Sequence, residues 1–264
     1  MKYIVLNWKL FPENETKAIN LVSLICQNFK KLDKKTQKKY KLILCPPFIY
    51  IPPLQKYLNA QKFQNILSLG GQNVFYHNRG AYTGEISPMM LKSYNVRYCL
   101  VGHSERKLIF HETNEDIRNK TQALLNQNMK SIICVGEKKR NERENSMSFR
   151  IKNEIFTQLN EILRGIPFDK MTSLMIAYEP IWAISKNNPT VLPAPEDVKK
   201  AINNIKFWLE TRFANEAAKN IPILYGGSVN PQNFQKYLEI SDGVLVGSAG
   251  TKKESIAHII KNLS

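Results

Sequence analysis

Eight short, almost uninterrupted apolar segments recur along this chain about every 30 residues, and amphipathic stretches separate most of them. Strands covered by helices on both faces read as continuous apolar runs, because neither face meets water. Eight strand–helix units predict a closed, eight-stranded parallel (β/α)₈ barrel, and a doubly wound open sheet is the alternative. The predicted strands are Tyr3–Asn7, Lys41–Cys45, Ile66–Gly70, Tyr98–Gly102, Ser131–Val135, Ser173–Tyr178, Ile221–Tyr225 and Gly243–Val246.

Helix-start signals follow several of these segments. Ser87-Pro88 and Asn230-Pro231 each place a capping side chain before a proline, which is favoured at the first helical position. Pro195 is followed by two acidic residues, which the helix dipole favours in a first turn. No Gly-, Ser- or Pro-rich linker divides the sequence. We therefore expect one barrel domain over residues 1–264.

Composition narrows the class of protein further. At 43% hydrophobic residues, a chain of 264 residues can bury a sizeable core, which excludes wholesale disorder. The four cysteines form no C-x-x-C pair, and at least Cys45, Cys99 and Cys134 lie in apolar strand-like runs. We therefore expect buried, reduced thiols and no metal site.

The formal net charge of +16 raises the possibility of a nucleic-acid partner. The lysines are dispersed, however, and no zinc-finger, heptad or aromatic-basic signature accompanies them, so no nucleic-acid partner is expected. No apolar stretch has the roughly 18–20 residues that a membrane span needs. The start of the chain also lacks a secretory signal pattern, and the predicted compartment is the cytoplasm.

Polar groups occupy most of the predicted strand ends, where barrels of this kind carry their chemistry. Glu179 follows a buried strand and precedes a proline, which suits a positioned general base. His103 can donate a hydrogen bond to a carbonyl, and Lys9 can stabilise a developing negative charge. The glycine-rich ends of the last two strands offer backbone N–H groups to a phosphate. Together these groups predict proton abstraction beside a carbonyl on a small phosphorylated molecule.

Five sequence blocks carry a resemblance to a known family. In their order and approximate spacing they closely resemble the triosephosphate isomerase family, and the resemblance covers essentially the whole chain. The blocks are Asn7–Lys9, Gly80–Ser87, Val101–Arg106, Ala177–Ile184 and Tyr225–Val229. The resemblance implies a TIM barrel that interconverts dihydroxyacetone phosphate and D-glyceraldehyde 3-phosphate in glycolysis and gluconeogenesis, with no cofactor or metal.

The same resemblance implies a role for each matching residue. Glu179 would shuttle the proton, His103 would polarise the carbonyl as a neutral electrophile, and Lys9 would neutralise charge. Asn7 would bind the substrate oxygen, and Glu105 would support the site from behind. Backbone or hydroxyl donors to the phosphate would come from Ser185, Ser228, Gly247 and Ser248. Thr83 would reach into the neighbouring subunit's site in a homodimer.

Two departures from the family pattern affect the phosphate-binding loops. Where the family's lid reads Gly-Thr-Gly-Lys, this chain has Ser185-Lys186-Asn187-Asn188, and Ser248 replaces a second glycine after the eighth strand. Serine keeps the backbone N–H at both positions, so we expect an active enzyme with an altered lid hinge. Two alternative functions are a non-catalytic barrel that binds polyanions through its basic surface, and another phosphosugar isomerase.

Overall fold

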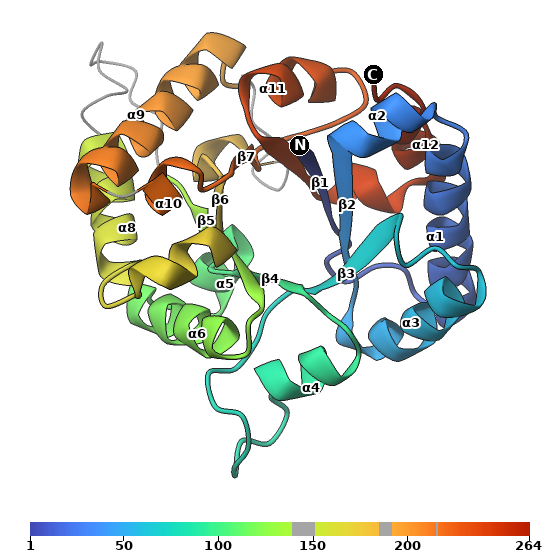
Figure 1. Cartoon of the computed structure of the whole chain (residues 1–264), viewed down its shortest axis with the longest axis horizontal. Coiled ribbons are helices and arrows are strands. Elements are labelled where there is room, and N and C mark those ends of the chain that lie inside the picture. Colours follow the sequence, from blue (N-terminus) through green and yellow to red (C-terminus); the bar gives the residue numbers. More distant parts are fainter. Residues whose placement is uncertain (139–150, 185–191, 215) are drawn as a thin grey trace.

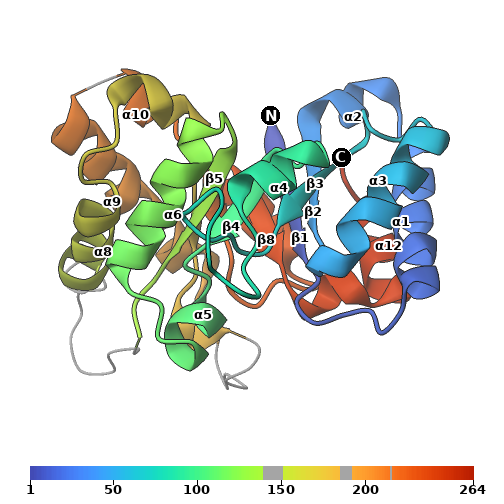
Figure 2. The same ribbon diagram turned by 90° about the horizontal axis from the view of Figure 1, so that it is seen from below.

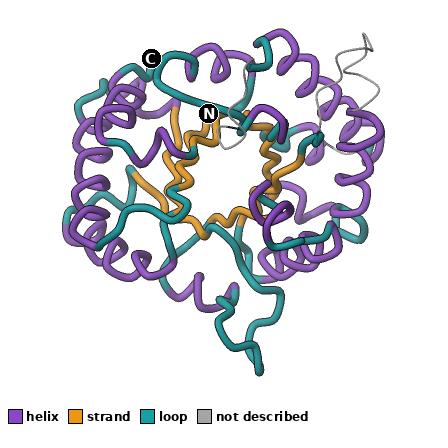
Figure 3. The backbone as a smooth tube through the Cα atoms, turned by 180° about the vertical axis from the view of Figure 1, so that it is seen from behind, coloured by secondary structure: helices purple, strands orange, loops and turns teal. Residues whose placement is uncertain are grey.

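The eight strands close into a parallel barrel at the centre of the molecule, and helices surround it (Figures 1 and 3). Each strand pairs with the next, and β1 pairs with β8 through partners such as Tyr3 and Gly243. The computed structural model describes residues 1–138, 151–184, 192–214 and 216–264. The strands are β1 (Lys2–Asn7), β2 (Tyr40–Cys45), β3 (Leu67–Gly71), β4 (Tyr98–Val101), β5 (Lys130–Val135), β6 (Leu174–Tyr178), β7 (Ile223–Tyr225) and β8 (Gly243–Val246).

Helices of varied length connect the strands. The α-helices are α1 (Glu15–Lys30), α2 (Lys34–Lys39), α3 (Ile51–Ala60), α4 (Pro88–Ser93), α5 (Ser104–Ile109), α6 (Asn114–Asn126), α8 (Phe156–Ile162), α9 (Pro195–Phe213), α10 (Glu216–Lys219), α11 (Phe234–Ile240) and α12 (Lys253–Lys261). Short 3₁₀ or π turns are η1 (Phe48–Tyr50), η2 (Ile151–Ile155), η3 (Phe168–Ser173), η4 (Ile181–Ala183) and η6 (Ser248–Thr251). None of the helices in the described part of the chain is long and apolar enough to cross a membrane.

The closed barrel confirms the predicted fold class and excludes the open-sheet alternative. All eight predicted strands occur, with ends shifted by at most two residues. Ser87 caps α4 as predicted, since its hydroxyl accepts from the N–H of Met90. The prediction that Pro231 begins a helix was wrong. The Asn230 side chain accepts from the N–H groups of two residues in the following turn, and the helix starts only at Phe234.

Two apolar clusters fill the fold. The larger lies between the strands and the surrounding helices, and it includes buried residues of α1, α3, α9 and α12. The smaller lines the inside of the barrel, with Val5, Ile43, Leu100, Ile132, Ala177, Leu224 and Leu245 among its members. Because side chains alternate along a strand, the residues two positions from these also face the barrel interior. All four cysteines are buried free thiols, as predicted.

The two ends of the barrel differ in what they carry. Figure 2 places the N-terminus at one end and α5 at the other, with the strands running between them. Since all strands are parallel, their carboxyl ends gather at the α5 end. That end holds the ionisable residues singled out above.

Candidate active site

A small cavity opens where the interior face of the barrel continues past the strand ends. Asn7 and Glu179 each lie two residues beyond an interior apolar residue, so their side chains point inward, and Gly226 and Gly247 occupy the equivalent positions after β7 and β8. The cavity is lined by Asn7, Lys9, His103, Ser104, Glu179, Ile184, Gly226, Gly227, Val229, Leu245, Gly247 and Ser248. Residues from β1, β4, β6, β7 and β8 and the turns after them therefore share one space.

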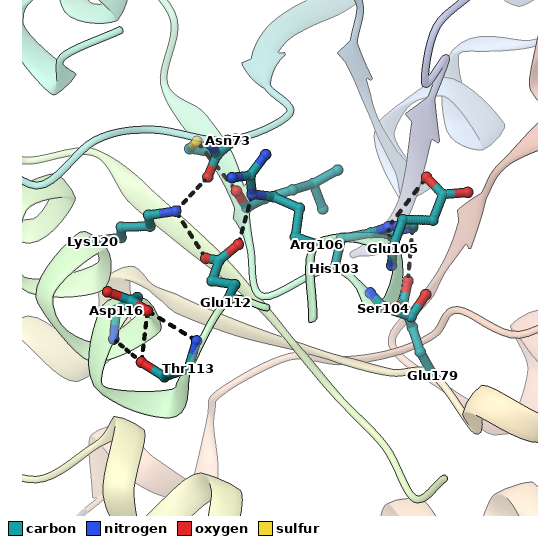
Figure 4. Close-up of polar contacts among 12 residues, drawn as sticks. Asn73, His103, Ser104, Glu105, Arg106, Glu112, Thr113, Asp116, Lys120 and Glu179 are labelled. Atoms are coloured by element: carbon teal, nitrogen blue, oxygen red, sulfur yellow. Dashed lines mark hydrogen bonds and ion pairs between the residues drawn. The ribbon is translucent and has the colours of Figure 1, made fainter. Parts of the chain in front are cut away.

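Glu179 directly follows β6 and is only 2% exposed. Its backbone N–H donates to the carbonyl of Val135 at 2.7 Å, which continues the β5–β6 ladder by one residue. Its Oε2 accepts from the backbone N–H of Ser104 at 3.2 Å, and its Oε1 lies 3.5 Å from His103 Nε2 (Figure 4). The carboxylate is thus held at the first turn of α5, where an anion is favoured.

His103 caps the N-terminus of α5 and is 8% exposed. Its Nδ1 accepts a hydrogen bond from the backbone N–H of Glu105 at 3.3 Å. A backbone N–H can only donate, so Nδ1 must present its lone pair. The hydrogen-bond network therefore assigns the neutral tautomer with the proton on Nε2, the nitrogen that faces Glu179.

Lys9 has a left-handed backbone, with a φ of 52°, which is uncommon for a residue with a side chain. Two side chains hold that backbone in place. The Lys9 N–H donates to Asn7 Oδ1 at 3.0 Å, and the Lys9 carbonyl accepts from Gln72 Nε2 at 2.8 Å. The ammonium Nζ lies 2.7 Å from Glu105 Oε1, an ion pair that is about one quarter exposed.

The glycine-rich segments after β7 and β8 also line the cavity. Gly227, Val229, Gly247 and Ser248 line it, and Ser248 begins the 3₁₀ turn η6. Ser228 lies between two lining residues and is 9% exposed, and its carbonyl accepts from Asn233 Nδ2 at 2.8 Å. Backbone amides at a turn start suit a phosphate group.

A second buried carboxylate lies behind the cavity at the end of β5. Glu137 Oε1 accepts from the Tyr178 hydroxyl at 3.1 Å and from Trp182 Nε1 at 2.8 Å. Its Oε2 is buried and has no hydrogen-bond partner within the described ranges. Burial is the main cause that raises the pKa of Glu137, and the two hydrogen bonds oppose it.

The structure brings most of the residues chosen from sequence to this one cavity: Asn7, Lys9, His103, Glu179, Gly247 and Ser248 line it, and Glu105 contacts Lys9. Thr83 does not line it, because it lies in an exposed loop that projects from the barrel (Figure 3). Ser185, like Lys186–Asn188, falls outside the described residues.

Sequence reasoning assigned no individual role to Ser104 or Gln72, and it treated Gly226 only as part of a glycine-rich strand end that offers N–H groups to a phosphate. Each of them follows a strand at its carboxyl end, so the strand-end rule applied to every polar or glycine residue would have selected them. Among the residues that the structure describes, no three His, Cys, Asp or Glu side chains could together hold a metal ion.

Comparisons with known proteins agree with this architecture along nearly the full chain. Residues 2–263 match the family described as Triosephosphate isomerase. The triosephosphate isomerase of Dictyoglomus thermophilum is 36% identical over 263 residues, covering 99% of both chains. That of Dehalococcoides mccartyi is 38% identical over 265 residues, covering 99% of this chain and 96% of its own. The crystal structure of triosephosphate isomerase from Bartonella henselae superposes with a TM-score of 0.76 at 28% identity, covering 98% and 97% of the two chains.

Proposed function

Since the chain belongs to the triosephosphate isomerase family, it interconverts dihydroxyacetone phosphate and D-glyceraldehyde 3-phosphate, and we propose that Glu179, His103 and Lys9 carry that reaction. The convergence of these three side chains on one cavity supports the proposal most directly. The proposal includes a single domain over residues 1–264. A polyanion-binding barrel without activity and a different phosphosugar isomerase have no comparable support in the comparisons.

Glu179 is the proposed base. Its carboxylate takes a proton from the carbon beside the substrate carbonyl, and the electron pair of that C–H bond forms the enediolate double bond. The same carboxyl group then returns the proton to the neighbouring carbon, while the proton of the substrate hydroxyl passes to the former carbonyl oxygen and leaves a new carbonyl behind, so no atom is gained or lost. Two observations support this role: the Glu179 carboxylate is buried, and it lies beside His103, the proposed partner of the substrate carbonyl. A base in that place lies beside the carbons that exchange the proton.

His103 is the proposed electrophile. In the structure its Nε2–H faces Glu179 Oε1 across 3.5 Å, which is longer than a good hydrogen bond. A substrate carbonyl oxygen that entered between them would accept from Nε2 in place of the carboxylate. The neutral imidazole then donates to the oxygen on which negative charge develops.

Lys9 is proposed to stabilise that charge as a cation, with Asn7 beside it as a hydrogen-bond donor to the substrate. Two side chains hold the Lys9 backbone, so the ammonium is positioned before substrate arrives. Glu105 is a proposed positioning residue, because it touches Lys9 rather than the cavity centre. Gly247, Ser248 and Ser228 are the proposed phosphate ligands, and Ser185 joins them on the sequence pattern alone.

Replacing Glu179 by Asp tests the assignment of the base. Shortening the side chain by one methylene withdraws the carboxylate from the substrate carbons, and we expect kcat to fall about 10²-fold or more in a coupled isomerase assay. The matched control is Glu239→Asp, the same change at an exposed glutamate of α11, which should leave kcat unchanged. Full activity of Glu179→Asp would show that another group is the base.

A homodimer is also proposed, through the loop that carries Thr83. Figure 2 shows this loop running between α4 and α5. Large apolar side chains are exposed on the loop, on α4 and at the C-cap of α5. The exposed fractions are 42% for Tyr82, 53% for Met90 and 63% for Phe110. An apolar surface of this kind marks a protein–protein contact.

Sedimentation equilibrium tests the dimer. Wild-type protein should show the mass of two chains, and Met90→Asp should shift it toward one chain with lower activity. Phe207→Asp, at a 66% exposed phenylalanine on α9, serves as the control and should keep the dimer mass. A wild-type mass of one chain at micromolar concentration would rule the dimer out.

A further inference from the structure

The end of the barrel opposite the active site carries an unusual interior layer. Lys41 and Lys130 each lie two residues before an interior apolar residue, Ile43 and Ile132, so strand alternation directs both lysines inward. Interior layers of such barrels are normally filled with branched apolar side chains. Here β2 and β5, which are not neighbours in the sheet, each bring an ammonium group to the same mouth of the barrel.

A third cation joins these two lysines. Arg97 immediately precedes β4, and its carbonyl accepts from the N–H of Lys130 at 2.8 Å, so the two residues are adjacent. Burial lowers the pKa of Lys41, and the positive charges of Arg97 and Lys130 lower it further. Lys41 therefore lies within range of the positive charges of both Arg97 and Lys130.

The described residues provide no counterion for this group. No carboxylate within the described ranges forms an ion pair with Lys41, Arg97 or Lys130. The Asp242 carboxylate lies near this layer, where its negative charge adds to the effect of burial and raises the pKa of Tyr3. It is already engaged by Lys206 at 3.1 Å and by the N–H of Ile223 at 2.9 Å. The three cations thus form a net positive group.

Two phenols complete the layer. Tyr3 packs against the interior cluster, and Tyr98 is 7% exposed. Burial raises the pKa of both hydroxyl groups, so each keeps its proton and remains a hydrogen-bond donor. Two ammonium groups, one guanidinium and two phenols are all donors, and an oligophosphate, with several charged acceptor oxygens, complements them.

We propose that Lys41, Lys130 and Arg97 form a second anion site, at the N-terminal mouth of the barrel, that binds a small molecule bearing a chain of two or more phosphate groups. One phosphate cannot neutralise three cations contributed by separate parts of the sheet, whereas a phosphate chain can contact all three. The site is separated from the catalytic cavity by the length of the barrel, as the positions of the N-terminus and α5 in Figure 2 show.

Calorimetric titration with inorganic tripolyphosphate tests the proposal. Saturating glycerol 3-phosphate keeps the catalytic cavity occupied, so that the titration reports other sites. We expect wild-type protein to bind one tripolyphosphate per chain, and Lys41→Gln/Lys130→Gln to bind it at least about tenfold more weakly. The matched control is Lys35→Gln/Lys38→Gln, which removes the same charge from exposed lysines of α2 and should change the affinity less than about twofold.

Arg97→Gln provides a second variant at an exposed position, where the fold does not depend on the side chain, and it too should weaken binding. Isomerase activity retained by all variants shows that they fold. A titration with adenosine 5′-triphosphate identifies the kind of ligand. An affinity equal to that for tripolyphosphate shows that the site recognises the phosphate chain alone, and a higher affinity shows that it also recognises the nucleoside. The proposal is overturned if wild-type protein binds no tripolyphosphate, or if the α2 control loses as much affinity as Lys41→Gln/Lys130→Gln.

Discussion

A Cβ atom at Gly226 would lie 2.7 Å from Cγ of Glu179, closer than real Cβ atoms approach other heavy atoms. The glycine that follows β7 therefore makes room for the proposed base, which arrives from β6. Two of the three atoms nearest to such a Cβ belong to Glu179, since its Oε1 would lie 3.3 Å away, so added bulk at Gly226 would press on this side chain.

Gly226→Ala should therefore reduce kcat by about 10²-fold, since a displacement of about 1 Å at a reacting group has an effect of that size. Gly250→Ala is the control, because a Cβ there would make ordinary contacts, the nearest 3.5 Å from Leu6. Steady-state kinetics on both variants provides the comparison. Wild-type kcat in Gly226→Ala would mean that Glu179 does not act from this position.

Gln72 should matter to activity although it does not line the catalytic cavity. Its amide donates to the carbonyls of Lys9 and Cys45, at 2.8 and 2.9 Å, and so ties the turn after β1 to the end of β2. Gln72→Met leaves both carbonyls without this donor and should lower the free energy of unfolding by about 1–3 kcal/mol.

We also expect kcat to fall about tenfold in Gln72→Met, because Lys9 then loses one of the two hydrogen bonds that hold its left-handed backbone. Gln61→Met, at an exposed glutamine, controls for the change of side chain and should leave both quantities unchanged. Urea denaturation and the isomerase assay measure them. Loss of stability without loss of kcat would separate Gln72 from the positioning of Lys9.

Glu137 should make the stability of the protein decrease as pH rises above its ordinary carboxyl range. Its pKa is raised by burial above the value of 4.5 that applies when the chain is unfolded. Between the unfolded and folded pKa values the native state binds the extra proton, so the free energy of unfolding falls as pH increases through that window.

Glu137→Gln removes the titration while keeping an oxygen to accept from Tyr178 and Trp182. We expect the variant to gain stability relative to wild type as pH rises above 4.5, measured by urea denaturation at each pH. Glu239→Gln, at an exposed glutamate on α11 that is not among the groups acting on Glu137, is the control and should keep the pH dependence of wild-type stability. Parallel pH profiles for wild type and Glu137→Gln would contradict the prediction.

Glu112 joins two cations in a buried network beside α5. Its Oε2 lies 2.6 Å from Arg106 Nε and its Oε1 lies 3.0 Å from Lys120 Nζ, which also donates to Asn73 Oδ1 at 3.0 Å (Figure 4). Glu112→Leu leaves the buried Lys120 without its counterion and should destabilise the protein by about 3–5 kcal/mol.

The double variant Glu112→Leu/Lys120→Met removes both buried charges and should recover part of that loss. The two single variants and the double variant form a thermodynamic cycle, in which we expect a coupling energy of about 1–3 kcal/mol. Additive losses would show that the two side chains do not stabilise each other.

The local sequence carried enough information to predict the barrel and its chemistry. Continuous apolar runs define the strands because both faces of each strand are buried, and parallel strands bring their carboxyl ends to one side. Glu179, His103 and Lys9 could therefore be assigned to one mouth without coordinates. The start of α11 was mispredicted because the Asn230 side chain binds the backbone of a turn, which competes with the helix.

Tertiary structure alone decided the contacts that depend on closure and register. Ser104 donates to Glu179 across 75 positions of sequence, and Gln72 reaches Lys9 across 63. The same closure brings Lys41 and Lys130, from non-adjacent strands, to one mouth of the barrel. Such distances and orientations arise only when eight strands share one barrel. The local sequence around a residue determines which strand it lies on, and the curvature of the whole sheet determines which residues its side chain contacts.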